Sequence, residues 1–255
     1  MVLTVDIGNS NIVIGGYGSD RQMRFSSRVT TDRTLEADQY AVKLQEICHL
    51  YSISPVEVDG IILSSVVPPL TCAMAQALHH IFGREPMLFS RHLNTGVTVD
   101  IDNPDELGAD ILASAVAVCK NDPLPAVIID MGTATTITAV TADKRVCGVS
   151  IVPGLYISLN ALTGNTSQLQ GIAVEPPTHA IGRNTVDSMK SGVVLGSASM
   201  LDGMIQRFRE ELGEVKTVAA TGGVAGIVIP HCRSSICYLP DLLLEGLYET
   251  YLMNS

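Results

Sequence analysis

The segment Val2-Leu3-Thr4-Val5-Asp6-Ile7-Gly8-Asn9-Ser10-Asn11-Ile12-Val13-Ile14 has the pattern of an apolar strand, a polar turn that begins with Asp-x-Gly, and a second β-branched strand. The same pattern returns in the segment from Ala126 to Val140, where the turn reads Asp130-Met131-Gly132-Thr133. The second aspartate follows the first by 124 residues (130 − 6). One such turn could be an ordinary hairpin that contains glycine. Its repetition between apolar strands favours a duplicated unit with a shared function.

The repeated turn has the chemistry of a phosphate-binding hairpin. Glycine lets the backbone adopt angles that are closed to other residues, so main-chain N–H groups can converge on an anion. The Ser, Thr and Asn residues add donors, and the aspartate can hold a cation that neutralises phosphate charge. Two such turns that face each other would form a cleft for a nucleoside triphosphate. The Walker-type sequence G-x-x-x-x-G-K-[ST] is absent, so a nucleotide would be bound without it.

The composition indicates an intracellular globular enzyme. A chain of 255 residues that is 46% hydrophobic can bury a large core. A formal net charge of -10 argues against nucleic acid or an anionic membrane as a partner. No apolar run is long enough to cross a bilayer and no basic region opens the chain, so we expect a cytoplasmic protein. Six cysteines without a C-x-x-C pair predict reduced, mostly buried thiols.

The repeat divides the chain into two expected α/β domains, residues 1–120 and 121–255, and Asn121-Asp122-Pro123-Leu124-Pro125 is the predicted linker. Each half should contain strands followed by helices. Thr34 or Asp32 is the expected cap of the first helix. The expected helices cover residues 35–51, 105–120, 184–213 and 241–253, and another begins at Pro68-Pro69. Further strands are expected over residues 60–67 and 215–220.

The glycines of Thr221-Gly222-Gly223 follow the last predicted strand. At the carboxyl end of a strand in an α/β sheet, glycine lets a ligand approach the backbone closely. Such a sequence can also be a simple strand-to-helix turn. Because it follows two phosphate-type hairpins, we expect Gly222 and Gly223 to contact the adenosine of a nucleotide.

Gly108-Ala109-Asp110 opens a predicted helix after Asn103-Pro104. A carboxylate in the first turn of a helix is often only a partner of the helix dipole, worth roughly 0.3–1 kcal/mol. The functional alternative is that Asp110 accepts the proton of a substrate hydroxyl or orients that hydroxyl for attack. Phosphoryl transfer requires little more from a protein than this, together with charge neutralisation and alignment.

At these residues the chain resembles the type III pantothenate kinases, a family of the actin/hexokinase-like phosphotransferase superfamily with two ribonuclease-H-like domains around a nucleotide cleft. The resemblance runs from Val2 to about Tyr251. The motifs that carry it, in order, are the turn that begins at Asp6, Ser64-Ser65-Val66-Val67-Pro68, Asn103-Pro104 with Gly108-Ala109-Asp110, the turn that begins at Asp130, Gly148 to Gly154, Ile181-Gly182-Arg183-Asn184-Thr185 and Ala220-Thr221-Gly222-Gly223.

The resemblance implies a role for each matching position. It makes Asp110 the proton acceptor, with Gly108 and Ala109 beside the substrate. It implies Mg²⁺ and a monovalent cation, potassium or ammonium, with the monovalent cation at Asp130. It also implies a homodimer in which Thr185 contacts pantothenate in the site of the neighbouring subunit. ATP phosphate contacts are implied at Thr133 and along Asp6, Ile7, Gly8, Asn9, Ser10, Asn11, Ile12 and Val13.

Two departures affect the acceptor side. The family has Arg after the aspartate of Gly-x-Asp, where this chain has Ile111, and Tyr two residues before Asn-Pro, where it has Ile101. A lost hydrogen bond to a charged group costs roughly 1.5–3 kcal/mol. A smaller departure is Cys147, where the family usually has a second glycine beside Gly148. The hypothesis is a kinase that phosphorylates pantothenate in coenzyme A synthesis. Its alternatives are a kinase for another small hydroxylated acceptor and a non-catalytic regulator that binds ATP; a sugar kinase is disfavoured.

Overall fold

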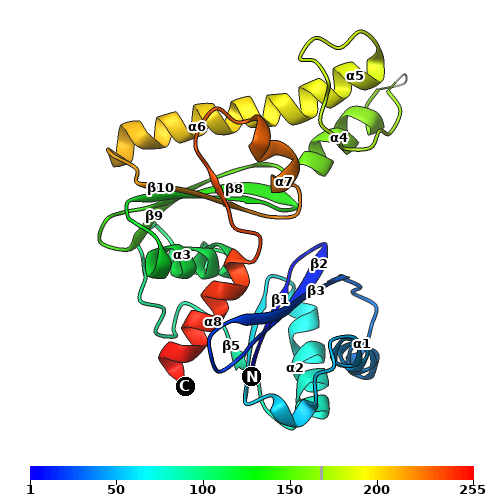
Figure 1. Cartoon of the computed structure of the whole chain (residues 1–255), viewed down its shortest axis with the longest axis vertical. Coiled ribbons are helices and arrows are strands. Elements are labelled where there is room, and N and C mark those ends of the chain that lie inside the picture. The colour runs from blue at the N-terminus through cyan, green and yellow to red at the C-terminus, as the bar shows by residue number, and fades with distance from the viewer. Residues whose placement is uncertain (167–168) are drawn as a thin grey trace. The chain divides into compact units, whose positions relative to one another are not determined.

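A computed structural model describes residues 1–166 and 169–255, and these form two compact units (Figure 1). Unit 1 comprises Met1–Val97, Asn103–Lys120 and Asp241–Ser255, and unit 2 comprises Thr98–Asp102 and Asn121–Pro240. These bounds differ from a division at residue 120 in two segments. Residues 98–102 lie in unit 2, and the terminal helix lies in unit 1.

Unit 1 is built on a five-stranded sheet with the strand order β3-β2-β1-β4-β5. The strands β1, β2 and β3 are antiparallel, and β4 and β5 then continue the sheet in parallel with β1. The strands are β1 (Val2–Ile7), β2 (Asn11–Tyr17), β3 (Met23–Thr30), β4 (Gly60–Ser65) and β5 (Met87–Leu88). The helices are α1 (Ala37–Leu50), α2 (Pro68–Phe82), α3 (Ala109–Asn121) and α8 (Leu242–Asn254).

The alternation of residues along β1 assigns the two faces of this sheet. Leu3, Val5 and Ile7 belong to a buried cluster that also contains the apolar residues of α1 and α2. Thr4 points to the opposite face, where its hydroxyl donates to the Gly15 carbonyl (3.3 Å). Helix α8 packs on that face, where Tyr248 stacks on Tyr17 beside Leu244, so the terminal helix completes the core of unit 1. The sequence pattern of a helix does not specify which sheet it covers, and this explains the difference from the expected division.

The start of the first helix is a local correction. Neither Thr34 nor Asp32 caps it, because α1 begins at Ala37 and its N-cap is Glu36. The backbone N–H of Glu36 donates to Oε1 of Gln39 (2.9 Å), in the manner of a capping box. Asp32 instead accepts hydrogen bonds from the backbone N–H and the hydroxyl of Thr34. The Pro68-Pro69 prediction is confirmed, since proline occupies the first turn of α2.

Unit 2 repeats the sheet of unit 1 and adds one strand. Its order is β11-β10-β7-β8-β9-β6, in which β9-β8-β7 is antiparallel and β10 and β11 are parallel to β7. The added strand β6 pairs with β9 in parallel. Even the register shift recurs, between Gly16 and Tyr17 in unit 1 and between Ala139 and Val140 in unit 2. The strands are β6 (Thr98–Val99), β7 (Ala126–Met131), β8 (Ala134–Val140), β9 (Arg145–Pro153), β10 (Thr217–Thr221) and β11 (Cys237–Tyr238).

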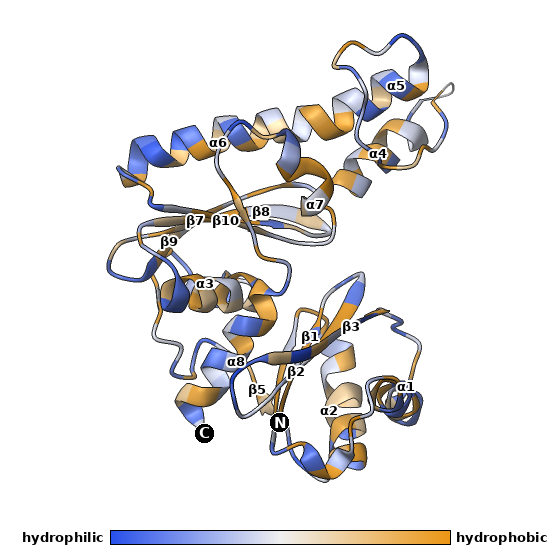
Figure 2. Ribbon diagram, viewed as in Figure 1, coloured by the Kyte–Doolittle hydropathy of each residue, from blue (hydrophilic) through white to orange (hydrophobic). Residues whose placement is uncertain are grey.

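The helices of unit 2 are α4 (Leu155–Gly164), α5 (Thr185–Lys190), α6 (Gly196–Leu212) and α7 (Ala225–Val228). Helix α6 alternates hydrophobic and hydrophilic segments along its length (Figure 2), and its buried residues Ala198, Leu201 and Ile205 join the apolar side chains of the sheet in one cluster. The predicted helix over 184–213 is confirmed, with one π-helical segment, Ser191–Leu195, between α5 and α6.

The structure also bears on the membrane and cysteine predictions. Within residues 1–166 and 169–255, no helix combines the length and the apolar character that a bilayer crossing requires. All six cysteines are free thiols. The expectation that most are buried is wrong, because only Cys48 and Cys119 are buried, whereas Cys72, Cys147 and Cys237 are exposed. Cys237 lies on the edge strand β11, and Cys72 lies on the exposed side of α2.

Candidate functional site

The first polar turn is a tight, braced hairpin at the end of β1. The backbone N–H of Gly8 donates to the Asn11 carbonyl (2.9 Å) and closes the turn. The Thr31 hydroxyl donates to the Gly8 carbonyl (2.7 Å), and the Thr31 N–H donates to the Ser10 carbonyl (3.0 Å). Arg33 adds a bond from Nη2 to Oδ1 of Asn9 (2.8 Å). Residues that follow β3 therefore hold this turn, a role that the sequence did not reveal.

The residues of this turn that are predicted to contact phosphate differ in exposure: two of the apolar ones are buried and some of the polar ones are exposed. Ile7 and Ile12 are fully buried in the apolar core of unit 1, so only their main-chain groups remain for a ligand. Asn9 and Ser10 are exposed. Asp6 is 7% exposed and pairs in register with Ser64 of β4, at the carboxyl ends of two parallel strands. A polar carboxylate at that edge, followed by exposed donors, is the arrangement expected of a phosphate and cation site.

The second polar turn lies at the equivalent end of β7 in unit 2. Asp130 pairs with Thr136 across the hairpin, as Asp6 pairs with Val13 in unit 1. A Cβ atom at Gly154 would overlap the Thr133 carbonyl and lie 2.7 Å from the Gly132 carbonyl. Position 154, between β9 and α4, must therefore be glycine for the backbone to pass this close to the turn.

The Thr-Gly-Gly sequence meets this same hairpin. Gly222 has φ +100°, and a Cβ atom there would lie 2.5 Å from the Met131 carbonyl carbon. The conformation and the space both require glycine. Gly223 is exposed and follows directly. Unit 2 thus brings Asp130, the Gly132-Thr133 turn and the Gly222-Gly223 turn to one edge of its sheet.

Asp110 stands in the first turn of α3 in unit 1, as predicted. It is half-buried, and its Oδ1 accepts the backbone N–H of Ile111 (2.9 Å). Burial raises the pKa of this carboxyl above its ordinary value, and the hydrogen bond from Ile111 opposes the shift only in part. A Cβ atom at Gly108 would overlap Oδ1. Gly108 therefore leaves room for the carboxylate, and Ala109 is the first residue of the helix.

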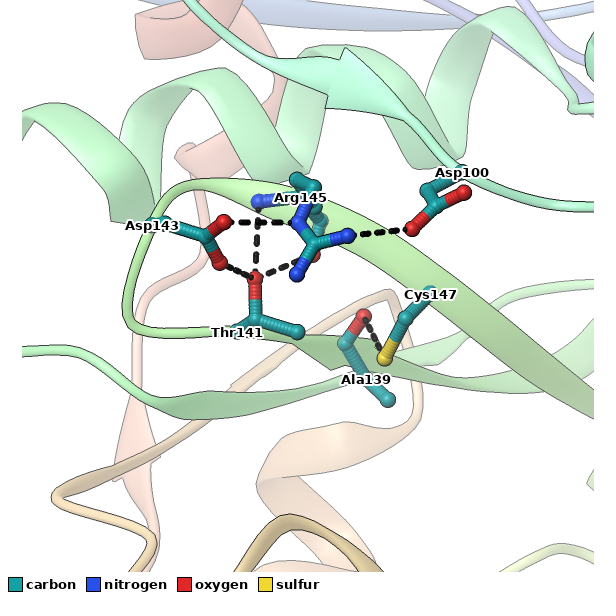
Figure 3. A network of polar contacts seen from close by, with 6 residues as sticks. All are labelled: Asp100, Ala139, Thr141, Asp143, Arg145 and Cys147. Atoms are coloured by element: carbon teal, nitrogen blue, oxygen red, sulfur yellow. Dashed lines mark hydrogen bonds and ion pairs between the residues drawn. The ribbon is translucent and has the colours of Figure 1, made fainter.

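Ile101 lies in unit 2, one residue beyond a polar network that joins β6 to the β8–β9 turn (Figure 3). Nη1 of Arg145 donates to Oδ2 of Asp100 (2.7 Å), and Nε of Arg145 donates to Asp143 (2.7 Å). Cys147 also belongs to this region, and its thiol donates to the Ala139 carbonyl (3.7 Å). Two of the three positions that depart from the family pattern are therefore neighbours of one ion-pair network.

Thr185 is the first residue of α5, and Asn184 caps that helix by accepting the Asp187 N–H (2.9 Å). A Cβ atom at Gly182 would overlap Ser188, so glycine allows the preceding loop to lie against the helix. An open groove of about 540 Å³ lies here within unit 2. Its lining consists of Leu162, Leu169, Gly182, Arg183, Asn184, Thr185, Ser188, Met189, Gly192 and Val193.

The predicted site residues thus fall into two sets. The turn from Asp6 to Val13 and the segment Gly108–Ile111 belong to unit 1, whereas Ile101, Asp130, Thr133, Thr185, Gly222 and Gly223 belong to unit 2. In the part of the chain that the structure describes, no group of three or more His, Cys, Asp or Glu side chains could hold a metal ion. Mg²⁺ does not require such a group, since it is commonly held by one or two carboxylates together with phosphate oxygens and water.

Comparison with known proteins gives the family. A model of the type III pantothenate kinase family matches residues 2–207. The chain is similar to a protein named type III pantothenate kinase from Roseiflexus sp. (strain RS-1), with 39% identity over 100% of this chain and 99% of that protein. The proteins of that name from Exiguobacterium sibiricum and Moorella thermoacetica are 37% and 34% identical, and each alignment covers 100% of both chains.

Solved structures support the fold alone, because their sequence identities are low. A structure from Campylobacter jejuni described as a conserved putative Baf family transcriptional activator aligns with a TM-score of 0.58 at 17% identity, over 99% of this chain and 98% of its own. An activator of 2-hydroxyisocaproyl-CoA dehydratase from Clostridium difficile aligns with a TM-score of 0.57 at 10% identity, over 99% and 95%. The predicted fold class, an α/β protein of the actin/hexokinase-like type, is confirmed.

Proposed function

The chain belongs to the type III pantothenate kinase family, and we infer from this membership that it catalyses the ATP-dependent phosphorylation of pantothenate in coenzyme A biosynthesis. The observation that carries this inference is similarity over the full length, at 34–39% identity, to proteins of that name. The reaction transfers the γ-phosphoryl group of ATP to the primary hydroxyl of pantothenate. The residue roles that follow are proposals within this function.

We propose that Asp110 accepts the proton of the pantothenate hydroxyl. A general base works best when its pKa approaches the working pH, and burial moves the pKa of Asp110 in that direction. The absence of a side chain at Gly108 leaves room for the carboxylate in its present orientation. The bond that Oδ1 accepts from Ile111 fixes one carboxylate oxygen, which leaves the second oxygen for the substrate hydroxyl.

We propose that the two hairpins hold the triphosphate. Asp6 with the exposed donors Asn9 and Ser10 would contact phosphates and Mg²⁺, and Asp130 with Thr133 would contact phosphates and a monovalent cation. Oxygen donors of this kind suit both cations, and when bound they would offset the charge that makes a bare carboxylate beside a phosphate repulsive. The exposed Gly223, next to the turn at Gly222, is available for the adenosine.

The cation proposal has its own test. Wild-type turnover should rise with potassium or ammonium, and Asp130→Asn should lose that response while Asp6→Asn should instead require more Mg²⁺. Turnover that is unchanged when potassium is replaced by a large organic cation would remove the monovalent cation from the proposal.

We propose further that the protein is a homodimer in which Thr185 serves the acceptor site of the partner. The surface around Thr185 supports this, since it combines the groove with large apolar side chains that are exposed in a single chain. The exposed apolar residues of this part of unit 2 are Tyr156, Ile157, Leu162, Ile181 and Val186. A two-fold dimer would bury such a surface twice and create two equivalent shared sites.

Mixing two inactive variants tests the shared site. Asp110→Asn and Thr185→Glu homodimers are dissociated, combined and allowed to reassociate. In a shared-site dimer, each mixed dimer has one site with both defects and one site with neither. About half of randomly formed dimers are mixed, so about a quarter of the sites should regain activity. If both residues serve the same subunit, mixing restores nothing and the shared site is wrong.

A second candidate acceptor is favoured by one observation. Ile101 and Ile111 replace two polar residues of the family on the acceptor side. If the missing Arg is only a weakness of a pantothenate pocket, Ile111→Arg should lower the KM for pantothenate. Ile101→Tyr should lower this KM as well, and the two effects need not be additive. If both substitutions weaken turnover, the pocket serves a different small hydroxylated acid or binds pantothenate in another way.

One assay separates the main function from its alternatives. ATP turnover is measured with and without pantothenate, and then with other hydroxylated acids. Turnover stimulated by pantothenate supports the proposal, and turnover only with another acid supports the second candidate. ATP binding without turnover under all conditions would indicate a non-catalytic regulator of the same fold.

A further inference from the structure

We infer that Arg145 is a positioning residue for the acceptor site, which it serves by fixing Asp100 and therefore the adjacent Ile101. This inference rests on the proposed function, in which Ile101 lines the acceptor pocket. Arg145 is the first residue of β9, at the far side of the turn from β8 (Figure 3). None of the sequence motifs includes it.

The guanidinium of Arg145 is itself held in place. Its Nε lies 2.7 Å from Oδ2 of Asp143, and the other oxygen of Asp143 accepts the Thr141 hydroxyl (2.6 Å). The Thr141 hydroxyl also accepts the backbone N–H of Arg145 (3.1 Å). Because the guanidinium is planar, fixing Nε also fixes the direction in which Nη1 donates to Asp100. Figure 3 shows the guanidinium between the two carboxylates.

The segment that Arg145 contacts pairs with β9 over a short length. Strand β6 has only two residues, Thr98 and Val99, which pair with Arg145 and Val146. The Thr98 N–H donates to the Lys144 carbonyl (3.0 Å), and the Asp100 N–H donates to the Val146 carbonyl (2.8 Å). A pairing this short is weak by itself. The side-chain contact at Asp100 therefore adds to the short backbone pairing that holds the chain just before Ile101.

The departures from the family pattern lie on both sides of this contact. Ile101 follows Asp100 in the segment just after β6, and Cys147 follows Val146 within β9. The Cys147 thiol packs against the Ala139 carbonyl of β8, a side-chain contact that a glycine at position 147 could not make. The chain thus departs from the family pattern in both segments that Arg145 joins. An aliphatic side chain at Ile101 can orient the acceptor only through its shape, so the position of its backbone must be well defined.

The test compares Arg145→Ala with a matched control. Arg145→Ala should raise the KM for pantothenate about three- to fivefold, the upper part of the range for an exposed ion pair, and leave the KM for ATP unchanged. Arg145→Lys should give a KM for pantothenate between those of the wild type and Arg145→Ala, because lysine keeps the charge but lacks the planar guanidinium. Arg24→Ala breaks an ion pair of the same length with Asp20 (2.7 Å) in unit 1 and should change neither KM.

Further variants separate the inference from the function on which it rests. Asp100→Ala should resemble Arg145→Ala, and the double variant should be no worse than either single variant. Equal changes in both KM values, or no change for Arg145→Ala, would overturn the inference. Ile101→Ala tests the premise directly: if it changes the KM for pantothenate while Arg145→Ala does not, only the positioning role is wrong. If Ile101→Ala has no effect either, the proposed acceptor site fails as well.

Discussion

The two hairpins have equivalent places in two sheets of matching strand order, yet they are braced in different ways. In unit 1, the residue that follows the third strand is Thr31, and its hydroxyl bonds to the Gly8 carbonyl (2.7 Å). In unit 2, the residue that follows the third strand is Gly154, which packs its backbone against Gly132 and Thr133. The hairpin of unit 1 is thus held by a side-chain hydrogen bond, and the hairpin of unit 2 by a close backbone contact that only glycine allows.

This difference shows which part of the duplicated structure is fixed. The place of the turn at the end of the first strand is common to both units, although the turn is one residue longer in unit 1, between Ile7 and Ile12, than in unit 2, between Met131 and Thr135. The means of holding the turn is free to differ. The turn in unit 2 also packs against Gly222, so it has two glycine contacts where unit 1 has hydrogen bonds from Thr31 and Arg33.

The largest expected effect separates the proposed chemical roles of the two units. Asp110→Asn keeps the shape of the side chain and its acceptor oxygen but removes its basicity. Turnover should fall by roughly 10²–10⁴-fold, the usual range for loss of a general base. ATP binding, measured by calorimetry, and the response of the residual activity to potassium should remain. Near-normal turnover in this variant would show that Asp110 of unit 1 is not the proton acceptor.

The next effect concerns the packed hairpin. Gly154→Ala places a methyl group against the Thr133 carbonyl, and neither backbone can move without disturbing the turn. We expect a loss of about 1–3 kcal/mol in the free energy of unfolding, as for other overpacked sites, together with a raised KM for ATP. Denaturant unfolding and initial rates measure both.

Gly164→Ala is the matched control, since a Cβ atom at that position of α4 has nothing within 4 Å. It should leave both quantities unchanged. If Gly154→Ala behaves like this control, the hairpin of unit 2 is not held by close packing.

A smaller effect is expected at the bonded hairpin. Thr31→Val keeps the volume and removes one hydrogen bond, which contributes about 0.5–1.5 kcal/mol to stability. The KM for ATP should rise less than in Gly154→Ala, because the backbone bond from Thr31 to Ser10 remains. Thr34→Val, which removes an exposed local bond to Asp32, should have no effect on this KM. A change in Thr31→Val larger than that of Gly154→Ala would reverse the comparison.

The smallest effect is on stability as a function of pH. The folded-state pKa of Asp110 is raised from its ordinary 3.8, so the folded protein is penalised when this group ionises. Wild-type stability from this group is therefore complete below 3.8 and is lost as the pH rises through the raised pKa. Asp110→Asn should be more stable than the wild type at pH 7, and the difference should shrink toward pH 4. A difference of the opposite sign in thermal unfolding would contradict the burial of this carboxylate.

Local sequence patterns determined much of this protein. The paired Asp-x-Gly turns predicted the duplicated sheet, because alternation and turn chemistry act over a few residues and are legible without tertiary context. Proline at Pro68 and the cap at Asn184 fixed two helix starts for the same reason. The family motifs supplied the function, and the position of Asp110 in the first turn of its helix followed from Gly108 and the residues after it.

Only the tertiary structure decided how distant segments support the site. The bond from Thr31 to Gly8 spans 23 residues, and that from Arg145 to Asp100 spans 45. The terminal helix joined unit 1 because Tyr248 stacks on Tyr17 (ring centroids 4.2 Å apart) beside Leu244. The local sequence around each residue does not encode these contacts, because each contact depends on how distant segments come together in the folded protein. The sequence determined the turns and strands, and long-range packing determined what holds them in place.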